Sequence, residues 1–173
     1  MDELNYDVFS WFKQISIKKN TVLHLEGSVC NKLFYIKKGA VKTYFTTDEG
    51  LMKTRYIGME TSLVSCLSSF ISGTPSDESL MTIEESVLLY ITREQFYELV
   101  KTDTNFNQLY ITLLEAAYSV QHDILMQEKT QSAKQRYEYI MDKKPDLIQR
   151  LSNRQVASFL NISHETLSRV KSN

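Results

Sequence analysis

Residues that could read a nucleic acid lie close together near the end of the chain, in residues 163–171. Arg169 can donate two parallel hydrogen bonds to a guanine, and Glu165 can accept one from a cytosine amine. Serine and histidine side chains suit base edges or phosphate oxygens. In a helix, Leu167 and Val170 would point inward at i, i+3 spacing and leave the polar groups outside. The candidate DNA-binding residues are Arg154, Ser163, His164, Glu165, Thr166, Ser168, Arg169 and Lys171.

Two helices and a tight turn are expected to position these side chains. Ser152, followed three residues later by Gln155, forms a capping box, which predicts a helix start. Asn161 stands at the turn, where left-handed backbone is needed and Asn tolerates it. Ser163 would cap the second helix. The pattern predicts a helix-turn-helix whose second helix meets the major groove, and an ordinary αα corner with a solvated polar face is the alternative.

The charge of the chain is uneven along its length. Residues 1–128 carry 11 Lys and Arg against 17 Asp and Glu, whereas residues 129–173 carry 9 against 4. A segment that approaches a polyanion needs local positive charge, so the basic end favours nucleic-acid binding there. Uneven scatter of charges in a small protein is the alternative explanation.

Most of the first hundred residues are predicted to be β-structure. Short apolar or alternating runs are separated by turn signals such as Glu26-Gly27, Lys38-Gly39 and Asp48-Glu49-Gly50. Their spacing predicts a compact barrel or jelly roll. The expected strands are Gln14–Ile17, Val22–Leu25, Leu33–Lys37, Val41–Thr46, Met52–Ile57, Leu80–Ile83 and Val87–Ile91.

Helices are expected on both sides of this β-region. Residues 2–13 would form a short amphipathic helix, with Leu4, Val8, Phe9 and Phe12 on one side. After the strands, Thr92 and Gln95 make a capping box for a helix through about Val100. A long helix from about Thr104 to Glu128 follows, capped by Thr102 or Asp103. A further helix spans Ser132 to Met141, and residues 143–146 break it.

Apolar residues of the long helix recur every three or four positions, which predicts a seam for another long helix. We expect the partner to be a second copy of the chain, and packing on the β-region of the same chain is the alternative. The seam consists of Phe106, Leu109, Leu113, Ala116, Val120 and Ile124.

Neither catalysis nor metal binding is expected. His24, His122 and His164 are dispersed, and no hydrolase, metalloprotease or phosphate-loop motif is present. Cys30 and Cys66 lie far apart in the sequence without a partner at metal-ligand spacing, so they are predicted to be two isolated free thiols. The chain has no long apolar run and no signal sequence, which predicts a cytoplasmic protein without membrane contact.

This order of parts resembles the Crp/Fnr family of bacterial transcription regulators, whose N-terminal module is a cyclic-nucleotide-binding fold. The most family-like stretches are residues 26–45, 83–99 and 162–170. The family's S-x-E-T-x-x-R pattern matches Ser163, Glu165, Thr166 and Arg169. The resemblance implies base contacts for Glu165 and Arg169 and phosphate contacts for Ser163 and Thr166. His164 stands where relatives often have Arg or Pro, which implies a different preferred operator.

The resemblance further implies an α+β fold with three parts. Residues 1–103 would form a sensory β-roll, residues 104–128 a dimerisation helix, and residues 129–173 the DNA-binding domain. Relatives often continue into a longer tail or wing, so this last domain would be short or truncated. The implied function is that of a homodimeric regulator whose partners are double-stranded DNA and RNA polymerase. A β-roll that senses a ligand or binds a protein, without sequence-specific DNA binding, is the alternative.

The ligand pocket of the founding members is expected to be altered. The corresponding segment has no Arg between Arg55 and Arg93, so a cyclic phosphate would lack a cationic partner. We therefore expect no cofactor and no cyclic AMP binding, and a pocket lined by residues such as Leu63, Cys66, Leu67 and Phe70 that is filled or takes an apolar effector of unknown identity. The candidate pocket residues are Glu60, Thr61, Ser62, Leu63, Ser76 and Asp77.

Overall fold

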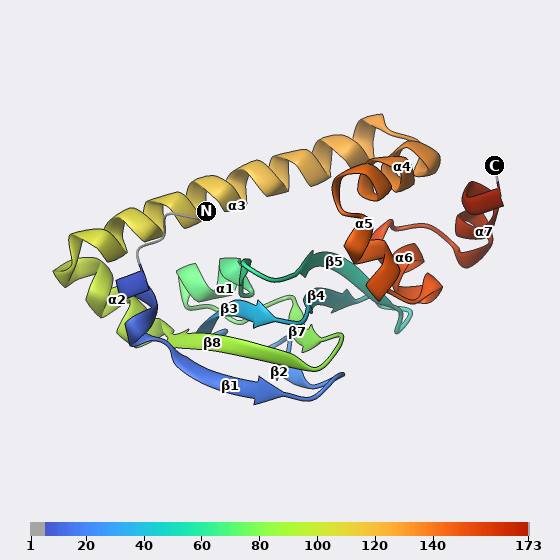
Figure 1. Ribbon diagram of the computed structural model, residues 1–173. Coiled ribbons are helices and arrows are strands. Elements are labelled where there is room, and N and C mark those ends of the chain that lie inside the picture. The colour runs from blue at the N-terminus through green and yellow to red at the C-terminus, as the bar shows by residue number, and fades with distance from the viewer. Residues whose placement is uncertain (1–5, 173) are drawn as a thin grey trace.

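The computed structural model describes residues 6–172 as an antiparallel β-roll, a long helix and a group of short helices (Figure 1). One sheet has the strand order β1-β8-β3-β6 and the other β2-β7-β4-β5. The predicted α+β architecture is confirmed. The strands are β1 (Lys13–Ile17), β2 (Val22–His24), β3 (Lys32–Lys38), β4 (Val41–Thr46), β5 (Met52–Gly58), β6 (Leu63–Val64), β7 (Ser79–Thr82) and β8 (Ser86–Thr92).

Alternation along the strands builds the core of the roll. The paired strands β3 and β8 are buried on both faces: Ile36 and Leu88 point into the roll, whereas Leu33 and Ile91 point to the opposite face, where they pack with residues of α2 and α3. Gly39 makes the sharp turn between β3 and β4 at φ +99°, where an added Cβ would overlap the Ser86 side chain. Only glycine fits this turn without strain.

Three short elements and the chain start differ from the sequence-based prediction. Strand β6 and helices α1 (Leu67–Ser72) and α5 (Pro145–Arg150) were not predicted, because two to six residues carry too little periodicity. The expected helix over residues 2–13 is a 3₁₀-helix at Tyr6–Trp11, and Leu4 lies outside the described residues. Val8 and Phe12 are buried as expected.

The other helices begin at the predicted caps. Helix α2 (Arg93–Thr102) starts at the Thr92–Gln95 capping box. The Asp103 side chain accepts hydrogen bonds from backbone amides in the first turn of α3 (Thr104–Thr130). Helix α4 (Ala133–Lys143) starts at a capping box formed by Ser132. Helices α6 (Asn153–Phe159) and α7 (His164–Ser172) complete the chain. None of the helices within residues 6–172 is long and apolar enough to cross a membrane.

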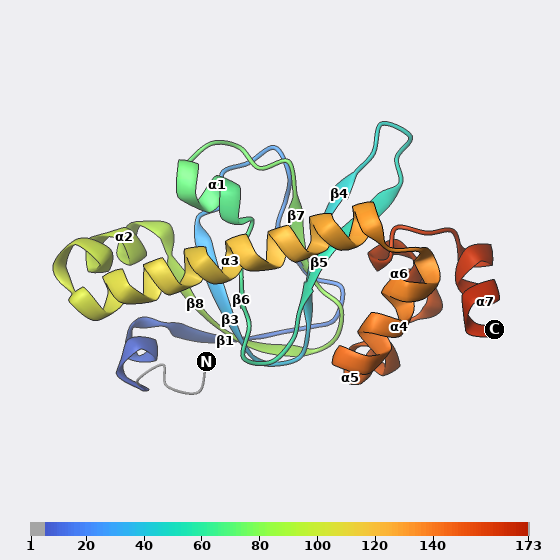
Figure 2. The same cartoon turned by 90° about the horizontal axis from the view of Figure 1, so that it is seen from above.

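Helix α3 has two different halves. Its first half packs on α2, where Phe106 lies edge-on to Phe96 with ring centroids 6.1 Å apart. Its second half runs over the roll and ends at α4 (Figure 2). Three residues of the expected dimer seam, Phe106, Leu109 and Leu113, are therefore buried in the chain's own core. For these three residues, packing within the same chain replaces the expected pairing with a second copy.

The C-terminal helices share a core with the roll. Ala40, Ile57 and Ile83 of the roll belong to the same apolar cluster as Leu147 of α5 and Val156 of α6. Helix α6 lies beside β5 (Figure 1). The helix-turn-helix is thus packed directly against the β-roll.

Candidate nucleic-acid interface and effector pocket

Helices α6 and α7 form a helix-turn-helix with the predicted local chemistry. Ser152 and Gln155 form the capping box of α6. Asn161 adopts φ +52° at the turn, as its sequence position predicted. The Ser163 hydroxyl accepts a hydrogen bond from the Thr166 amide at 3.1 Å and therefore caps α7.

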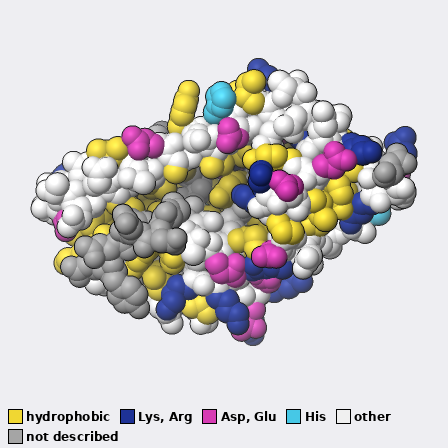
Figure 3. Space-filling model, turned by 45° about the horizontal axis from the view of Figure 1, so that its top comes forward, with side chains coloured by type: hydrophobic (Ala, Val, Ile, Leu, Met, Phe, Trp, Pro, Cys, Tyr) yellow, Lys and Arg dark blue, Asp and Glu magenta, His cyan; other side chains and the backbone are white. Residues whose placement is uncertain are grey.

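The outer face of α7 presents the predicted polar side chains. Leu167 is buried and Val170 is half-buried, so His164, Glu165, Ser168 and Arg169 are left exposed. Hydrogen bonds from the Glu165 backbone amide and from Ser163, which favour the carboxylate, lower the pKa of Glu165. Lys and Arg side chains are visible at this end of the molecule (Figure 3).

Two other candidates contact neighbouring elements. Lys171 Nζ donates a hydrogen bond to Asn153 Oδ1 at 2.6 Å, which links the end of α7 to the start of α6. Arg154 is exposed on α6. Burial, and then the positive charge of Arg154, lower the pKa of Lys42 on β4, so Arg154 lies within electrostatic range of the roll.

A cluster of three charged side chains fastens α5 to the roll. Arg150 donates to Glu60 at 2.8 and 3.0 Å and also pairs with Glu84. Glu60 accepts a further hydrogen bond from the Gly39 amide at 2.7 Å. Glu60, an expected pocket residue, is therefore paired with α5 and is not among the residues that line the cavity between the roll and α3. The role of Arg150 was missed, since nothing local in the sequence indicates its partners.

A cavity of about 290 Å³ lies between the roll and α3. Its walls include Ser62, Leu63 and Leu67, which were expected, and Leu113 and Ala117 of α3. Three other expected lining residues lie elsewhere. The Thr61 backbone amide donates a hydrogen bond to the Ile36 carbonyl oxygen, and the Ser76 hydroxyl donates one to the Glu78 carbonyl oxygen. Asp77 is exposed to solvent. Cys66 and Phe70 are buried in the core, and neither lines the cavity.

Arg55 on β5 lines this cavity, so the pocket does contain a guanidinium. The sequence predicted no cationic partner for a bound phosphate, because no arginine lies between Arg55 and Arg93. The guanidinium is occupied by an ion pair with Glu78. Thr43 also lines the cavity, and its buried hydroxyl has no hydrogen-bond partner among residues 6–172.

Helix α3 exposes a different apolar face from the expected seam, and this face runs through both halves of the helix. Ile111, Tyr118 and Leu125 recur every seven residues and have relative exposures of 43%, 75% and 48%. At this spacing they share one side of the helix, opposite Phe106, Leu109 and Leu113. Of the expected seam, Val120 is exposed and Ala116 and Ile124 are half-buried.

The two cysteines are not isolated. Cys30 and Cys66 are both buried, and one ligand atom each from Cys30, Cys66 and His24 lie within 4.8 Å of one another. The prediction of two free thiols is confirmed, whereas the nearby His24 was not predicted. Their spacing in the sequence gave no signal, because the roll brings together segments more than thirty residues apart.

The cyclic nucleotide-binding domain model matches residues 14–103, which is more than half of the chain. The chain belongs to the cyclic nucleotide-binding domain family. Its match covers the β-roll and α2 and ends at the N-cap of α3. A search of curated proteins finds no match to this sequence.

Solved structures extend the likeness of this family member to its C-terminal helices. The structure of FixK2 from Bradyrhizobium japonicum has a TM-score of 0.82 at 14% identity, over 93% of this chain and 83% of that one. The c-di-GMP-responsive regulator CLP from Xanthomonas campestris gives 0.72 at 16% identity, over 99% and 90%. The catabolite activator protein of Thermus thermophilus gives 0.59 at 21% identity, over 99% and 82%. The whole chain therefore has the fold of Crp/Fnr-type regulators.

Proposed function

We propose that this protein is a transcription regulator that binds double-stranded DNA as a homodimer. The observation that carries the proposal is the orientation of α7. Its Leu167 is buried against the domain, while Glu165 and Arg169 are exposed and free to meet base edges. The structural similarity to the global regulator CLP supports the same function.

Local charge supports the proposal. Residues 129–173 carry 9 Lys and Arg against 4 Asp and Glu, and they hold the helix-turn-helix. A basic end of this kind would draw the domain to the phosphate backbone, whereas the acidic remainder would be repelled.

We further propose that the second copy pairs along the exposed face of α3. Ile111, Tyr118 and Leu125 leave a stripe of apolar surface in water, and pairing two such stripes would remove it. A two-fold pair would present two α7 helices to half-sites about one helical turn, roughly 34 Å, apart.

The cavity is proposed to take no cyclic AMP in the way of the founding members, because Glu78 already neutralises Arg55. A neutral or apolar effector fits better with walls formed by Leu63, Leu113 and Ala117. The protein would equally work without an effector if side chains of α3 keep the cavity closed.

The experiment is selection of a binding site from a random duplex pool, followed by gel-shift titration at fixed salt. We expect a site with two-fold symmetry, and loss of affinity when about 5 bp are inserted between its half-sites, because half a turn moves them to opposite sides of the duplex. Failure to enrich any sequence, with a folded protein, would leave the β-roll as a ligand-sensing or protein-binding module.

A further inference from the structure

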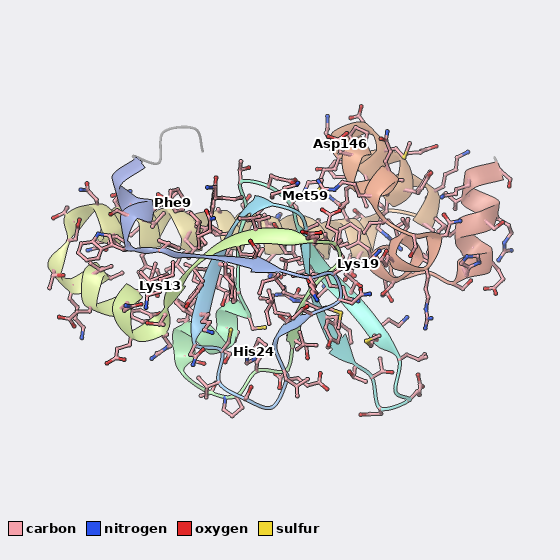
Figure 4. All side chains as sticks on the ribbon, turned by 60° about the horizontal axis from the view of Figure 1, so that its bottom comes forward. Phe9, Lys13, Lys19, His24, Met59 and Asp146 are labelled. Atoms are coloured by element: carbon pink, nitrogen blue, oxygen red, sulfur yellow. The ribbon has the colours of Figure 1, made fainter. Side chains whose placement is uncertain are left out.

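Three side chains with metal-ligating atoms meet inside the β-roll. His24 lies on β2, Cys30 lies between β2 and β3, and Cys66 immediately precedes α1. One ligand atom from each lies within 4.8 Å of the other two. Figure 4 marks His24 on β2. Both thiols are almost fully buried, with exposures of 1% and 2%.

The imidazole of His24 has an unused buried nitrogen. Its Nε2 is inaccessible to solvent and has no hydrogen-bond partner among residues 6–172. A buried polar atom without a partner costs free energy, so such atoms are rare unless something else binds them. A lone pair on a ring nitrogen beside two sulfurs is the donor arrangement that a metal ion uses.

Both sulfurs make only long hydrogen bonds within the chain: Cys30 Sγ lies 3.7 Å from the Lys32 carbonyl oxygen and Cys66 Sγ lies 3.4 Å from the Glu78 carbonyl oxygen. Ser65 Oγ lies 3.4 Å from Cys30 Sγ and donates its own hydrogen bond to the Lys32 carbonyl oxygen at 2.9 Å. The thiolate is the form that binds metals.

We propose that His24, Cys30 and Cys66 bind one Zn²⁺ ion. Two sulfurs and one imidazole nitrogen suit zinc, whereas magnesium and calcium prefer oxygen donors. Ligand atoms around tetrahedral zinc lie roughly 3.5–4 Å apart, so the cluster would contract by about 1 Å. Both cysteines would bind as thiolates, each thiol releasing its proton to solvent on binding. No oxidation or reduction takes place.

The site would be coupled to the cavity. Cys66 Sγ donates to the backbone carbonyl of Glu78 at 3.4 Å, and the Glu78 carboxylate pairs with Arg55. When Cys66 binds zinc, it loses this hydrogen bond. The zinc ion would thereby act on the segment just before β7 that supplies the partner of Arg55.

The test is zinc titration of the full, reduced chain after removal of metal, in competition with a chromophoric chelator. We expect one equivalent to bind, with affinity falling as pH falls because protons compete for the thiolates. Saturating zinc should raise the melting temperature by roughly 5–10 °C. Cobalt(II) in its place should show thiolate charge-transfer absorption and tetrahedral bands.

Variants assign the ligands. Cys66→Ser, Cys30→Ser and His24→Gln should each lower zinc affinity by at least about tenfold. The matched control is His122→Gln on the exposed side of α3, which should leave affinity unchanged. Because the cysteine variants disturb the core, His24→Gln, at a half-buried position, is decisive when circular dichroism shows that it is folded. Absence of saturable zinc binding in the wild type, or full affinity in His24→Gln, overturns the proposal.

Discussion

Arg169 is the exposed side chain on α7 with the greatest capacity to distinguish bases. Its guanidinium can donate two hydrogen bonds to one guanine, so Arg169→Ala should cost about 1–3 kcal/mol on the selected site and relax specificity at one base pair per half-site. Lys171 offers only a point charge and is held by Asn153. Lys171→Ala should weaken all DNA about equally. Gel-shift titrations on the selected site and on random duplex check both expectations.

A cation far from α7 provides the control for this pair. Lys101 is exposed at the end of α2, and Lys101→Ala should leave DNA affinity unchanged. If Arg169→Ala kept its specific affinity, the docking of α7 in the major groove would be wrong.

Glu60 gives stability that depends on pH. Its hydrogen bonds to Arg150 lower the pKa of the carboxyl to about 2 from 4.5. The ion pair therefore stabilises the fold fully above pH 4.5, and this contribution is lost as the pH falls toward 2. Because Glu60 is 38% exposed, we expect a loss of only about 1 kcal/mol over this range.

Urea unfolding at a series of pH values measures this contribution. Glu60→Gln should be less stable than the wild type at neutral pH, and the difference should vanish in acid. Glu85→Gln, an exposed neighbour of Glu84, serves as the control and should follow the wild type. An equal difference at all pH values would exclude the Glu60–Arg150 pair as its source.

Among the helices and strands, the sequence predicted those features that depend on residues close together along the chain. The caps at Thr92, Ser132 and Ser152 were predictable because the capping residue and its partner are three residues apart. The seven longer strands were predictable from alternation. Strand β6 was not, because two residues have no period.

Contacts between distant segments could not be predicted in this way. Arg55 faces the cavity and Cys30 meets Cys66 only because the two sheets close on each other. Likewise, the period of α3 showed that the helix has an apolar side, but it did not distinguish the side that packs on α2 from the side left exposed. That choice depends on where the roll lies.

Helix α3 yields a prediction that separates its two sides. Tyr118→Glu or Leu125→Glu should produce a folded monomer with much weaker operator binding, because each places a charge in the proposed dimer seam. Leu113→Glu should instead destabilise the fold, since Leu113 is buried within the chain. Analytical ultracentrifugation and thermal unfolding distinguish the two results.

An exposed polar position on the same helix is the matched control. Ser119 is exposed to one side of the apolar stripe, so the Ser119→Glu variant should remain dimeric. Wild-type protein that sediments as a monomer at micromolar concentration and still binds its operator tightly would contradict the dimer proposal.

At the scale of the molecule, hydrogen bonds, an ion pair and apolar contacts join α5 and α6 to the roll. Ser158 of α6 accepts from the Thr54 amide at 3.0 Å, and Arg150 binds the roll from α5. The apolar cluster continues across the same junction. The cavity is lined by α3 and β5, and α6 contacts both β5 and α7. A structural change in the cavity would therefore be transmitted through α6 to α7.

The cavity itself supports the last prediction, which concerns cyclic nucleotides. Titration calorimetry with cyclic AMP or cyclic GMP at millimolar concentration should show no saturable binding, because Glu78 neutralises Arg55 and would repel the phosphate. Glu78→Gln removes that negative charge and frees the guanidinium, so this variant should gain measurable affinity for the cyclic phosphate. Asp77→Asn, at the exposed neighbouring position, removes the same charge outside the cavity and should gain none. Saturable binding by the wild type, with a shift in operator affinity, would show that Arg55 is available to a nucleotide despite its ion pair.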